Sequence, residues 1–226
     1  MKLLAIDTAT EACSAAIALD GQVLERFELE PRHGERILPM IEELLAESGL
    51  ALTQLDAIAF GRGPGSFTSL RIGAGVAQGL AFGADLPVIP VSSLAALAQG
   101  GDAHAVLAAF DARMGQVYWG AYRRGADGLV SLLGAEVVVD PARVPLPGGS
   151  GWSGAGSGWD VYHAPLSERL GAVLHGWTSG QYPRAGAVAR LAAAEFSVGR
   201  GLPPEQALPV YLRDDVAKPK GAESRK

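Results

Sequence analysis

A loop rich in glycine and hydroxyl groups, GRGPGSFTS at residues 61–69, is the stretch of this sequence best suited to hold a ligand. Three Gly and one Pro within five residues allow tight backbone turns. Ser66, Thr68 and Ser69 can each cap the helix that the pattern predicts next. A loop in this position exposes backbone N–H groups that favour an anion. No Lys follows the last Gly, so the loop is not a Walker A loop.

Arg71 lies in the first turn of that predicted helix, where a cation opposes the helix dipole. A bound anion or a carboxylate of a partner would compensate this placement. Two interpretations stay open, a ligand or partner contact and a tightly packed structural turn. The candidate ligand loop comprises Gly63, Pro64, Gly65, Ser66, Phe67, Thr68 and Arg71.

Asp7 and Asp111 stand at the ends of two similar apolar runs, LLAIDT (3–8) and VLAAFD (106–111). The end of a strand is a usual place for a carboxylate that positions a metal ion or a phosphate. However, Asp7 is followed by TATE (8–11), whose side chains would crowd a phosphate and whose carboxylate would repel it. We therefore expect the two aspartates to cap turns, and they are only weak candidates for chemistry.

No pattern for a catalytic nucleophile, a metal pair or a dinucleotide is legible. The His residues are never three to five apart, GxSxG is absent, and Cys13 is the only cysteine. GSGWSG (149–154) matches GxGxxG, but it follows PLPG (145–148) instead of a strand, and we expect no helix after it. GSGW (156–159) as a turn near a nucleotide cleft is a weaker interpretation. The sequence predicts no catalytic residue and no metal site.

The composition is that of a folded globular protein. The 226 residues are 48% hydrophobic and 19% charged, with a net charge of −5. That charge argues against nucleic acid as a tightly bound sole partner. The basic tail from Arg213 to Lys226 could touch RNA, although a solvated terminus is the preferred interpretation. No apolar run approaches the roughly 20 residues that span a bilayer, and Asp7 and Glu11 interrupt the place of a signal peptide. We expect a cytoplasmic protein without membrane contact.

The first half of the chain reads as a β-meander followed by alternating helices and strands. Three strand-like runs end near residue 29, and Asp20-Gly21 between the second and third is a strong hairpin signal. Apolar residues then recur at helical spacing over 33–48. The pattern further predicts strands at 56–60 and 87–91 and helices at 69–83 and 92–99. This order indicates an α/β architecture.

The second half begins like the first. VLAAFD (106–111) resembles LLAIDT (3–8), GQVYWGAY (115–122) follows at hairpin distance, and strand-like sequence continues over 129–139. The sequence therefore predicts a duplicated unit of β-meander plus α/β. Residues 141–158 read as irregular, 183–200 as an Ala-rich helix, and ALPVYLR (207–213) as a last element.

Three glycines, Gly75, Gly79 and Gly83, recur every four residues along the predicted helix 69–83. Each glycine inside a helix costs about 1 kcal/mol relative to Ala. That cost is offset if another backbone approaches this stripe closely. The neighbour is either the predicted helix 33–48 of the same chain or another subunit, and the sequence leaves both open.

Several stretches together resemble the TsaB family, also called YeaZ, which serves the synthesis of threonylcarbamoyladenosine (t6A) on tRNA. They are LLAIDTATEACSAAI, GRGPGSFTSLRIG, AQGLAFG, PVSSLAALAQG, DARMGQVYW and PVYLRDDVA. They cover both halves of the chain, and GPGSFT-x-LRIG is highly specific. Ser69 departs from the glycine that the family usually has there.

The resemblance implies two lobes of duplicated βββαβα type, as in the actin, Hsp70 and sugar-kinase superfamily and related to ribonuclease H. It implies a non-catalytic paralogue of TsaD, the subunit that transfers the threonylcarbamoyl group to adenosine 37. TsaD-like proteins carry a His-x-x-x-His metal pair where this chain has SSLAALA (92–98). No cofactor is implied, and a nucleotide at the junction with TsaD stays open.

The implied partners are TsaD, the ATPase TsaE and a second copy of the chain, with tRNA reached only through the complex. Family members pair through the helices that match 33–48 and 69–83. The expected interface residues are His33, Arg36, Ile37, Met40, Ile41, Leu44, Ser69, Ile72, Gly75, Val76, Gly79, Leu80 and Gly83.

We expect an N-terminal lobe over 1–103 that carries these helices. A C-terminal lobe would cover 104–213, with a last helix able to pack back on the first lobe, and 214–226 would be a flexible tail. Two other functions stay open, an enzyme that uses the cleft between the lobes, such as a peptidase or a kinase, and a direct tRNA-binding module.

Overall fold

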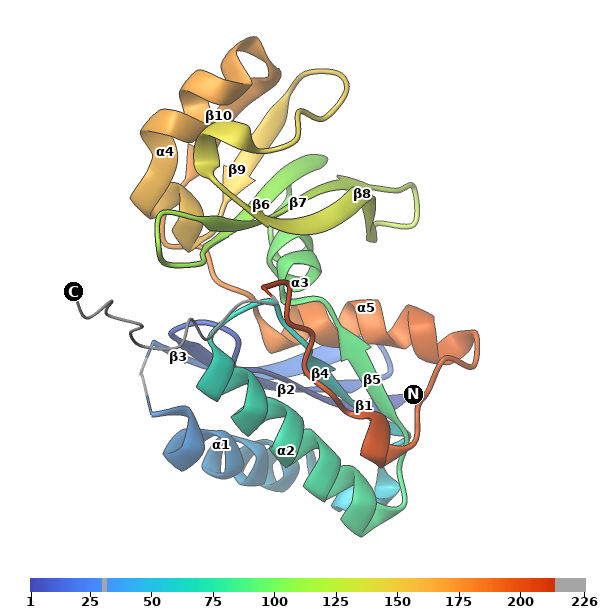
Figure 1. Ribbon diagram of the computed structural model, residues 1–226. Helices are drawn as coiled ribbons and strands as arrows, with labels where there is room; N and C mark the ends of the chain where they lie inside the picture. The colour runs from blue at the N-terminus through green and yellow to red at the C-terminus, as the bar shows by residue number, and fades with distance from the viewer. Residues whose placement is uncertain (30–31, 214–226) are drawn as a thin grey trace, which may run out of the picture.

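Two five-stranded sheets, one from each half of the chain, form the frame of the molecule (Figure 1). This computed structural model describes residues 1–29 and 32–213, so the predicted tail at 214–226 lies outside the described residues. In the described part, no helix is both long enough and apolar enough to cross a membrane.

The first sheet has the strand order β3-β2-β1-β4-β5. The antiparallel meander predicted from the sequence forms its first three strands. Asp20 and Gly21 both have positive φ, 48° and 89°, as the two central residues of a tight hairpin turn require. The strands are β1 (Lys2–Asp7), β2 (Ala12–Leu19), β3 (Gln22–Leu29), β4 (Ala57–Gly61) and β5 (Val88–Val91).

The second sheet repeats this topology. Its order is β10-β9-β6-β7-β8, which, taken from the other edge, places each strand in the position of its counterpart in the first sheet. The predicted duplication is thereby confirmed, with Asp7 and Asp111 each ending a central strand. The strands are β6 (Ala105–Asp111), β7 (Val117–Arg124), β8 (Val130–Val139), β9 (Trp152–Ala155) and β10 (Leu174–Thr178).

The helices follow the same duplicated plan, with one exception. The exception is α1, whose counterpart after β8 is only the 3-10 turn Pro141–Arg143. The helical pattern predicted for 33–48 therefore marks an element that the first lobe alone possesses. The helices are α1 (His33–Ser48), α2 (Phe67–Ala84), α3 (Ser93–Gly100), α4 (Ser157–Leu170) and α5 (Ala185–Ser197).

Each sheet is covered on both faces because its central strands are apolar on both sides. In β1, Leu4 and Ile6 face α1 and α2, whereas Leu3 and Ala5 face α5. The second sheet packs against α4 on one face and α3 on the other. The last helix of each lobe thus packs on the sheet of the other lobe. α3 and α5 lie together between the two sheets (Figure 1).

Two predictions for the second half were wrong. A helix, α4, does open shortly after the GxGxxG stretch, and Trp152–Ala155 within that region is a strand. The glycines of this motif precede or lie in the strand, so the motif does not supply the turn between a strand and a helix. Gly156 of GSGW (156–159), with φ of 104°, occupies the turn between β9 and α4 instead.

The last predicted element, 207–213, is neither helix nor strand. It is an extended segment that runs past the start of α2 and donates from Val210 N to the carbonyl of Arg62 at 2.8 Å. It ends near the tip of the β6–β7 hairpin, where Arg213 donates to Gln116. This C-terminal segment therefore touches both lobes.

Candidate functional site

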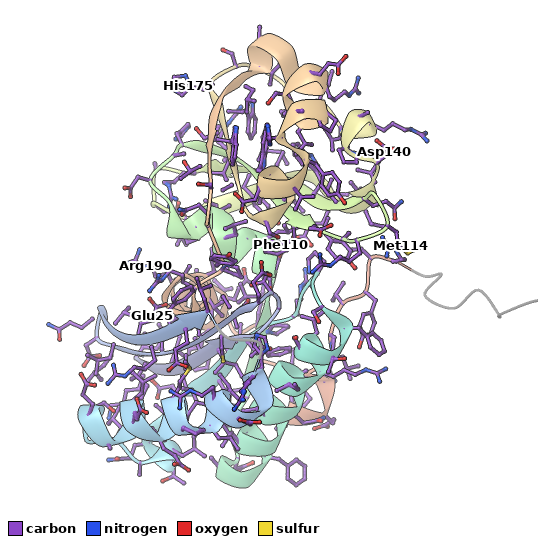
Figure 2. The ribbon with its side chains drawn as sticks, turned by 90° about the vertical axis from the view of Figure 1, so that its left-hand side faces the viewer. Glu25, Phe110, Met114, Asp140, His175 and Arg190 are labelled. Carbon is purple, nitrogen blue, oxygen red and sulfur yellow. The ribbon has the colours of Figure 1, made fainter. Side chains whose placement is uncertain are left out.

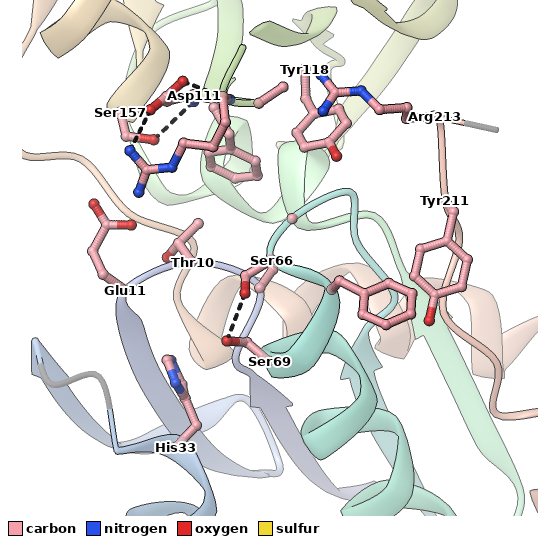
Figure 3. Close-up of a pocket in the computed structure, with 16 residues that line it drawn as sticks. Thr10, Glu11, His33, Ser66, Ser69, Asp111, Tyr118, Ser157, Tyr211 and Arg213 are labelled. Carbon is pink, nitrogen blue, oxygen red and sulfur yellow. Dashed lines mark hydrogen bonds and ion pairs between the residues drawn. The ribbon is translucent and has the colours of Figure 1, made fainter. Parts of the chain in front are cut away.

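A cavity of about 460 Å³ opens between the two lobes. Figure 2 shows Phe110 and Met114 of the second lobe at the level where the lobes meet. Figure 3 shows that Glu11, Thr10, Ser66 and Ser69 approach the cavity from the first lobe, whereas Asp111, Ser157 and Tyr118 approach from the second. The C-terminal segment adds Tyr211 and Arg213 to one wall.

The candidate ligand loop forms one wall because Gly65 within it, and Gly61 just before it, leave room for the chain around β1 to come close. A Cβ at Gly65 would lie 2.1 Å from the carbonyl oxygen of Ala9, and one at Gly61 would lie 1.9 Å from Asp7 Oδ2. Ser66 N donates to the carbonyl of Ala9 at 2.8 Å. The loop is thereby tied to the turn after β1, and the structural-turn interpretation accounts for its glycines.

The hydroxyl groups of this loop do not cap α2 as predicted. Ser66 is the residue before the first helical turn, but its side chain accepts no hydrogen bond from the helix backbone. Instead, Ser69 Oγ donates to Ser66 Oγ at 3.1 Å, and Thr8 Oγ1 donates to the carbonyl of Ser69 at 2.7 Å. Ser66 and Ser69 line the cavity, and Thr68 is exposed beside them.

Among the described residues Arg71 pairs with no carboxylate, so the bound anion or partner carboxylate expected beside it stays a prediction. Its Nε donates to the Tyr211 hydroxyl at 3.2 Å, and its guanidinium lies 3.9 Å from the centre of the Phe67 ring. Tyr211 and Phe67 also contact each other, with ring centres 5.2 Å apart. An aromatic cation–π contact thus compensates the unfavourable position of the charge.

The two equivalent aspartates have different surroundings. Asp7 is buried outside the cavity and accepts hydrogen bonds from Ala9 N at 2.9 Å and Ser93 Oγ at 2.8 Å. Burial raises the pKa of the Asp7 carboxyl to about 6, although both hydrogen bonds oppose the shift. Asp7 therefore caps the turn after β1 and shows no opening toward a substrate.

Asp111, in contrast, faces the cavity and holds Arg113. The carboxylate accepts from Arg113 N and from the Arg113 guanidinium, each at 2.8 Å. Tyr162 donates a third hydrogen bond to it at 3.2 Å. Burial first, and then the Asp111 charge, raise the pKa of Tyr162. Asp111 thus fixes a guanidinium group that is itself largely exposed.

The residues expected at a partner interface separate into three groups. Five are buried: four line the core beneath the first sheet, and His33 lines the cavity while its Nε2 hydrogen-bonds to the carbonyl of Ala12 at 3.0 Å. Three more, on α2, are half-buried against the same core. The buried ones are His33, Ile37, Met40, Ile41 and Leu44; the half-buried ones are Ile72, Val76 and Leu80.

The remaining predicted positions are outside the core. Arg36 pairs with Glu28 of its own lobe, and Ser69 belongs to the cavity wall. Gly75, Gly79 and Gly83 are exposed, and a Cβ on any of them would meet nothing within 4 Å. The 33–48 helix of the same chain is therefore not the neighbour that the glycine stripe requires.

Phe82 extends this stripe and was missed by the sequence analysis. It is 73% exposed on α2, three residues after Gly79 and therefore on the same side of the helix. Leu38 of α1 is also exposed, at 44%. The signal for Phe82 was available, because a large aromatic residue beside spaced glycines is unusual on a solvated helix face.

The cavity also contains residues to which the sequence assigned no role. They come from the hairpin after β6, the start of α4 and the C-terminal segment. The first and the last of these stretches carried the family resemblance, whereas Ser157 lies in GSGW (156–159), the weaker candidate for a turn near a nucleotide cleft. They are Arg113, Tyr118, Ser157, Tyr211 and Arg213.

Two lobes with one repeated strand order and exchanged last helices define an α/β chain of the actin, Hsp70 and sugar-kinase type. Residues 28–155 match the family model described as "TsaD: tRNA N6-adenosine threonylcarbamoyltransferase". The tRNA threonylcarbamoyladenosine biosynthesis protein TsaB of Escherichia coli is 46% identical over 228 residues, which cover 96% of each chain. The protein of that name from Haemophilus influenzae is 60% identical over 124 residues, covering 53% of this chain and 52% of its own.

A solved structure of YeaZ from Pseudomonas aeruginosa is similar throughout. It superposes with a TM-score of 0.87 at 46% identity and covers 93% of this chain and 99% of its own. This chain belongs to the TsaB family. The resemblance predicted from the sequence motifs is thereby confirmed.

Proposed function

We propose that this chain is a non-catalytic accessory subunit for t6A synthesis that binds TsaD through the outer face of α2. The proposal is supported by the names of its relatives and by the match to the TsaD family model. The observation that carries it is the α2 stripe, defined as Gly75, Gly79, Phe82 and Gly83, which is exposed and apolar.

The α2 stripe has the properties of a helix-packing surface that the described chain leaves uncovered. Spaced glycines let a second helix approach closely, and burial of an exposed Phe side chain contributes about 1.5–3 kcal/mol. Within the described chain, nothing covers the glycines. The same stripe would serve TsaD and a second copy of this chain in turn, with TsaE joining the TsaD complex and tRNA contacting the assembly.

The region after β5 supports the absence of transfer chemistry in this subunit. By family resemblance, the catalytic paralogue carries a metal-binding His pair here. In this chain Ser92 caps α3 by accepting from Ala95 N, and Ser93 donates to Asp7. Both side chains therefore stabilise local structure. We place the protein in the cytoplasm, where the complex would modify tRNA.

Reconstitution tests this function. We expect t6A to form on tRNA when this chain is mixed with TsaD and TsaE of its own organism, threonylcarbamoyl donor and ATP. Omission of this chain should lower the modification at least about tenfold, since TsaD would lose its activating partner. Nucleoside analysis by mass spectrometry measures the product. Unchanged t6A without this chain, or transfer by this chain alone, would contradict the proposal.

A further inference from the structure

The cavity between the lobes is separate from the α2 stripe and has no role in the proposed function. It meets α2 only at its start, through Ser66, Phe67 and Ser69, whereas the stripe begins at Gly75. Its volume of about 460 Å³ lies in the range of sites for small molecules. The side chains that line it determine which class of small molecule it would bind.

Two guanidinium groups reach the cavity from different elements. Arg113, at the tip between β6 and β7, is held by Asp111 through one backbone and one side-chain hydrogen bond. Arg213, in the C-terminal segment, donates to Gln116 Oε1 at 2.6 Å and to Met114 Sδ at 3.6 Å. Each Arg is oriented by one or two of its N–H groups, and a guanidinium has five. Further donors therefore remain on both.

Hydroxyl groups add donors around the same space. Ser66 and Ser69 share a hydrogen bond at the start of α2. Ser157, at the start of α4, accepts from Asp111 N at 3.2 Å, which leaves its own proton available to donate. The Tyr118 side chain completes this polar wall beside Arg213 (Figure 3). Such an excess of donors favours an oxygen anion.

The charged side chains that line the cavity determine which ligand charge it favours. Besides His33, its acidic and basic lining side chains are Glu11, Asp111, Arg113 and Arg213, so the carboxylates and guanidiniums balance. Glu11 is exposed at the rim of the first lobe, where it repels a second negative charge. A monoanion is therefore favoured over a dianion.

Apolar groups define the rest of the ligand. Phe67 is 45% exposed, and Phe110, Ala9 and Ala112 line the same cavity. We propose that the interlobe cavity binds a small organic monocarboxylate with an aromatic or apolar body, its carboxylate held by Arg113 and the serine hydroxyls.

Benzoate, benzamide and phenyl phosphate test this site in the full-length protein. At pH 8 the first is a monoanion, the second is its neutral analogue, and the third is largely a dianion because its second pKa is about 6. Titrations followed by ¹⁵N NMR would report the affinity and the residues whose signals move. We expect benzoate to bind at least about tenfold more tightly than benzamide, with shifts at residues 66–69, 113 and 157.

Charge variants separate specific binding from a general salt effect. Arg113→Gln should weaken benzoate about tenfold and leave benzamide unchanged, whereas the control Arg143→Gln, an exposed Arg outside the cavity, should change neither. Glu11→Gln should strengthen benzoate severalfold and phenyl phosphate more. Because Glu11→Gln leaves the Asp111–Arg113 pair intact, it still tests the charge preference if Arg113→Gln perturbs Asp111.

Three outcomes would overturn the proposal. They are equal binding of benzoate and benzamide, signal shifts confined to other surfaces, and weaker benzoate binding by Glu11→Gln. Tighter binding of phenyl phosphate than of benzoate would also contradict it, because the ligand would then be a phosphate ester and not a carboxylate. None of these measurements involves TsaD, so this proposal and the accessory function fail independently.

Discussion

Replacement of Gly79 by Trp is expected to weaken binding to TsaD at least about a hundredfold while the chain itself stays folded. Gly79 is exposed, and an added Cβ meets nothing within 4 Å, so the isolated protein has room for the new side chain. A helix that approaches the α2 stripe has no such room. Sedimentation velocity of the mixed proteins measures the complex, and urea unfolding measures the stability of the variant.

Matched controls decide whether the effect is steric. Gly79→Ala removes the cost of glycine in a helix and should stabilise the isolated chain by up to about 1 kcal/mol. Its single methyl group should weaken the complex much less than the indole. Glu168→Trp places the same side chain on an exposed position of α4 and should leave binding unchanged. Full binding by Gly79→Trp would place the interface elsewhere.

The same variant addresses pairing of the chain with itself. If one stripe serves both partners, Gly79→Trp should remove the homodimer together with the TsaD complex. Phe82→Ala should weaken both as well, since it removes the most exposed aromatic side chain of the stripe. Loss of one assembly without the other would show that the two use different surfaces.

The meander that opens each lobe could be predicted because its signals are local, whereas β9 and β10 were not predicted. Asp20-Gly21 sets a hairpin, and the apolar runs that end in Asp7 and Asp111 repeat one pattern. The last helix was expected to be able to pack back on the first lobe, but the packing of α3 on the second sheet could not be predicted from local signals. Apolar periodicity shows that a helix has a buried face, but it does not identify the sheet that covers the face.

α4 was missed for a reason that its sequence makes clear. The helix contains Pro165 and a non-helical residue, Tyr162, and it begins after Gly156 with φ of 104°. These features weaken a helical pattern, and tertiary contacts hold the helix instead. Trp159, buried within it, donates to the carbonyl of Leu107 at 2.8 Å and packs against Trp119.

The predicted interface combined two kinds of apolar residue that the sequence does not separate. Ile37, Met40 and Leu44 repeat at helical spacing because they cover the sheet of their own lobe. Gly75 and Gly79 repeat at the same spacing on the solvent side. Only the three-dimensional arrangement shows which set is free to meet a partner. Glu11, the Asp111–Arg113 pair and Arg213 lie far apart in sequence, so their meeting also required the fold.

Asp7→Asn is expected to become more stable relative to the parent chain as the pH rises. The Asp7 carboxyl is buried, and its pKa is raised from 3.8 to about 6 in the folded protein. The folded state therefore holds the proton more tightly than the unfolded state between about pH 4 and pH 6. Because of this, the contribution of Asp7 to stability falls as the pH rises through that window.

The size of the effect follows from the shift. Each pKa unit corresponds to about 1.4 kcal/mol, so ionisation of Asp7 costs the folded state about 3 kcal/mol above pH 6.5. Asn carries no charge at any pH, and it can still accept from Ala9 N and donate to Ser93 Oγ. Any loss from the weaker hydrogen bonds is the same at every pH. The stability difference between Asp7→Asn and the parent chain should therefore rise by about 1–3 kcal/mol between pH 4.5 and pH 7.5.

Urea unfolding across this pH range measures the difference, and an exposed aspartate supplies a control of opposite sign. The pKa of Asp20 is lowered, chiefly by its hydrogen bond from the N-terminal ammonium group. Asp20 stabilises the folded state above its unfolded pKa and loses that contribution as the pH falls. Asp20→Asn should thus lose stability relative to the parent chain as the pH rises. A stability difference for Asp7→Asn that stays flat with pH would show that the Asp7 carboxyl is ionised at little cost, and that water reaches the turn after β1.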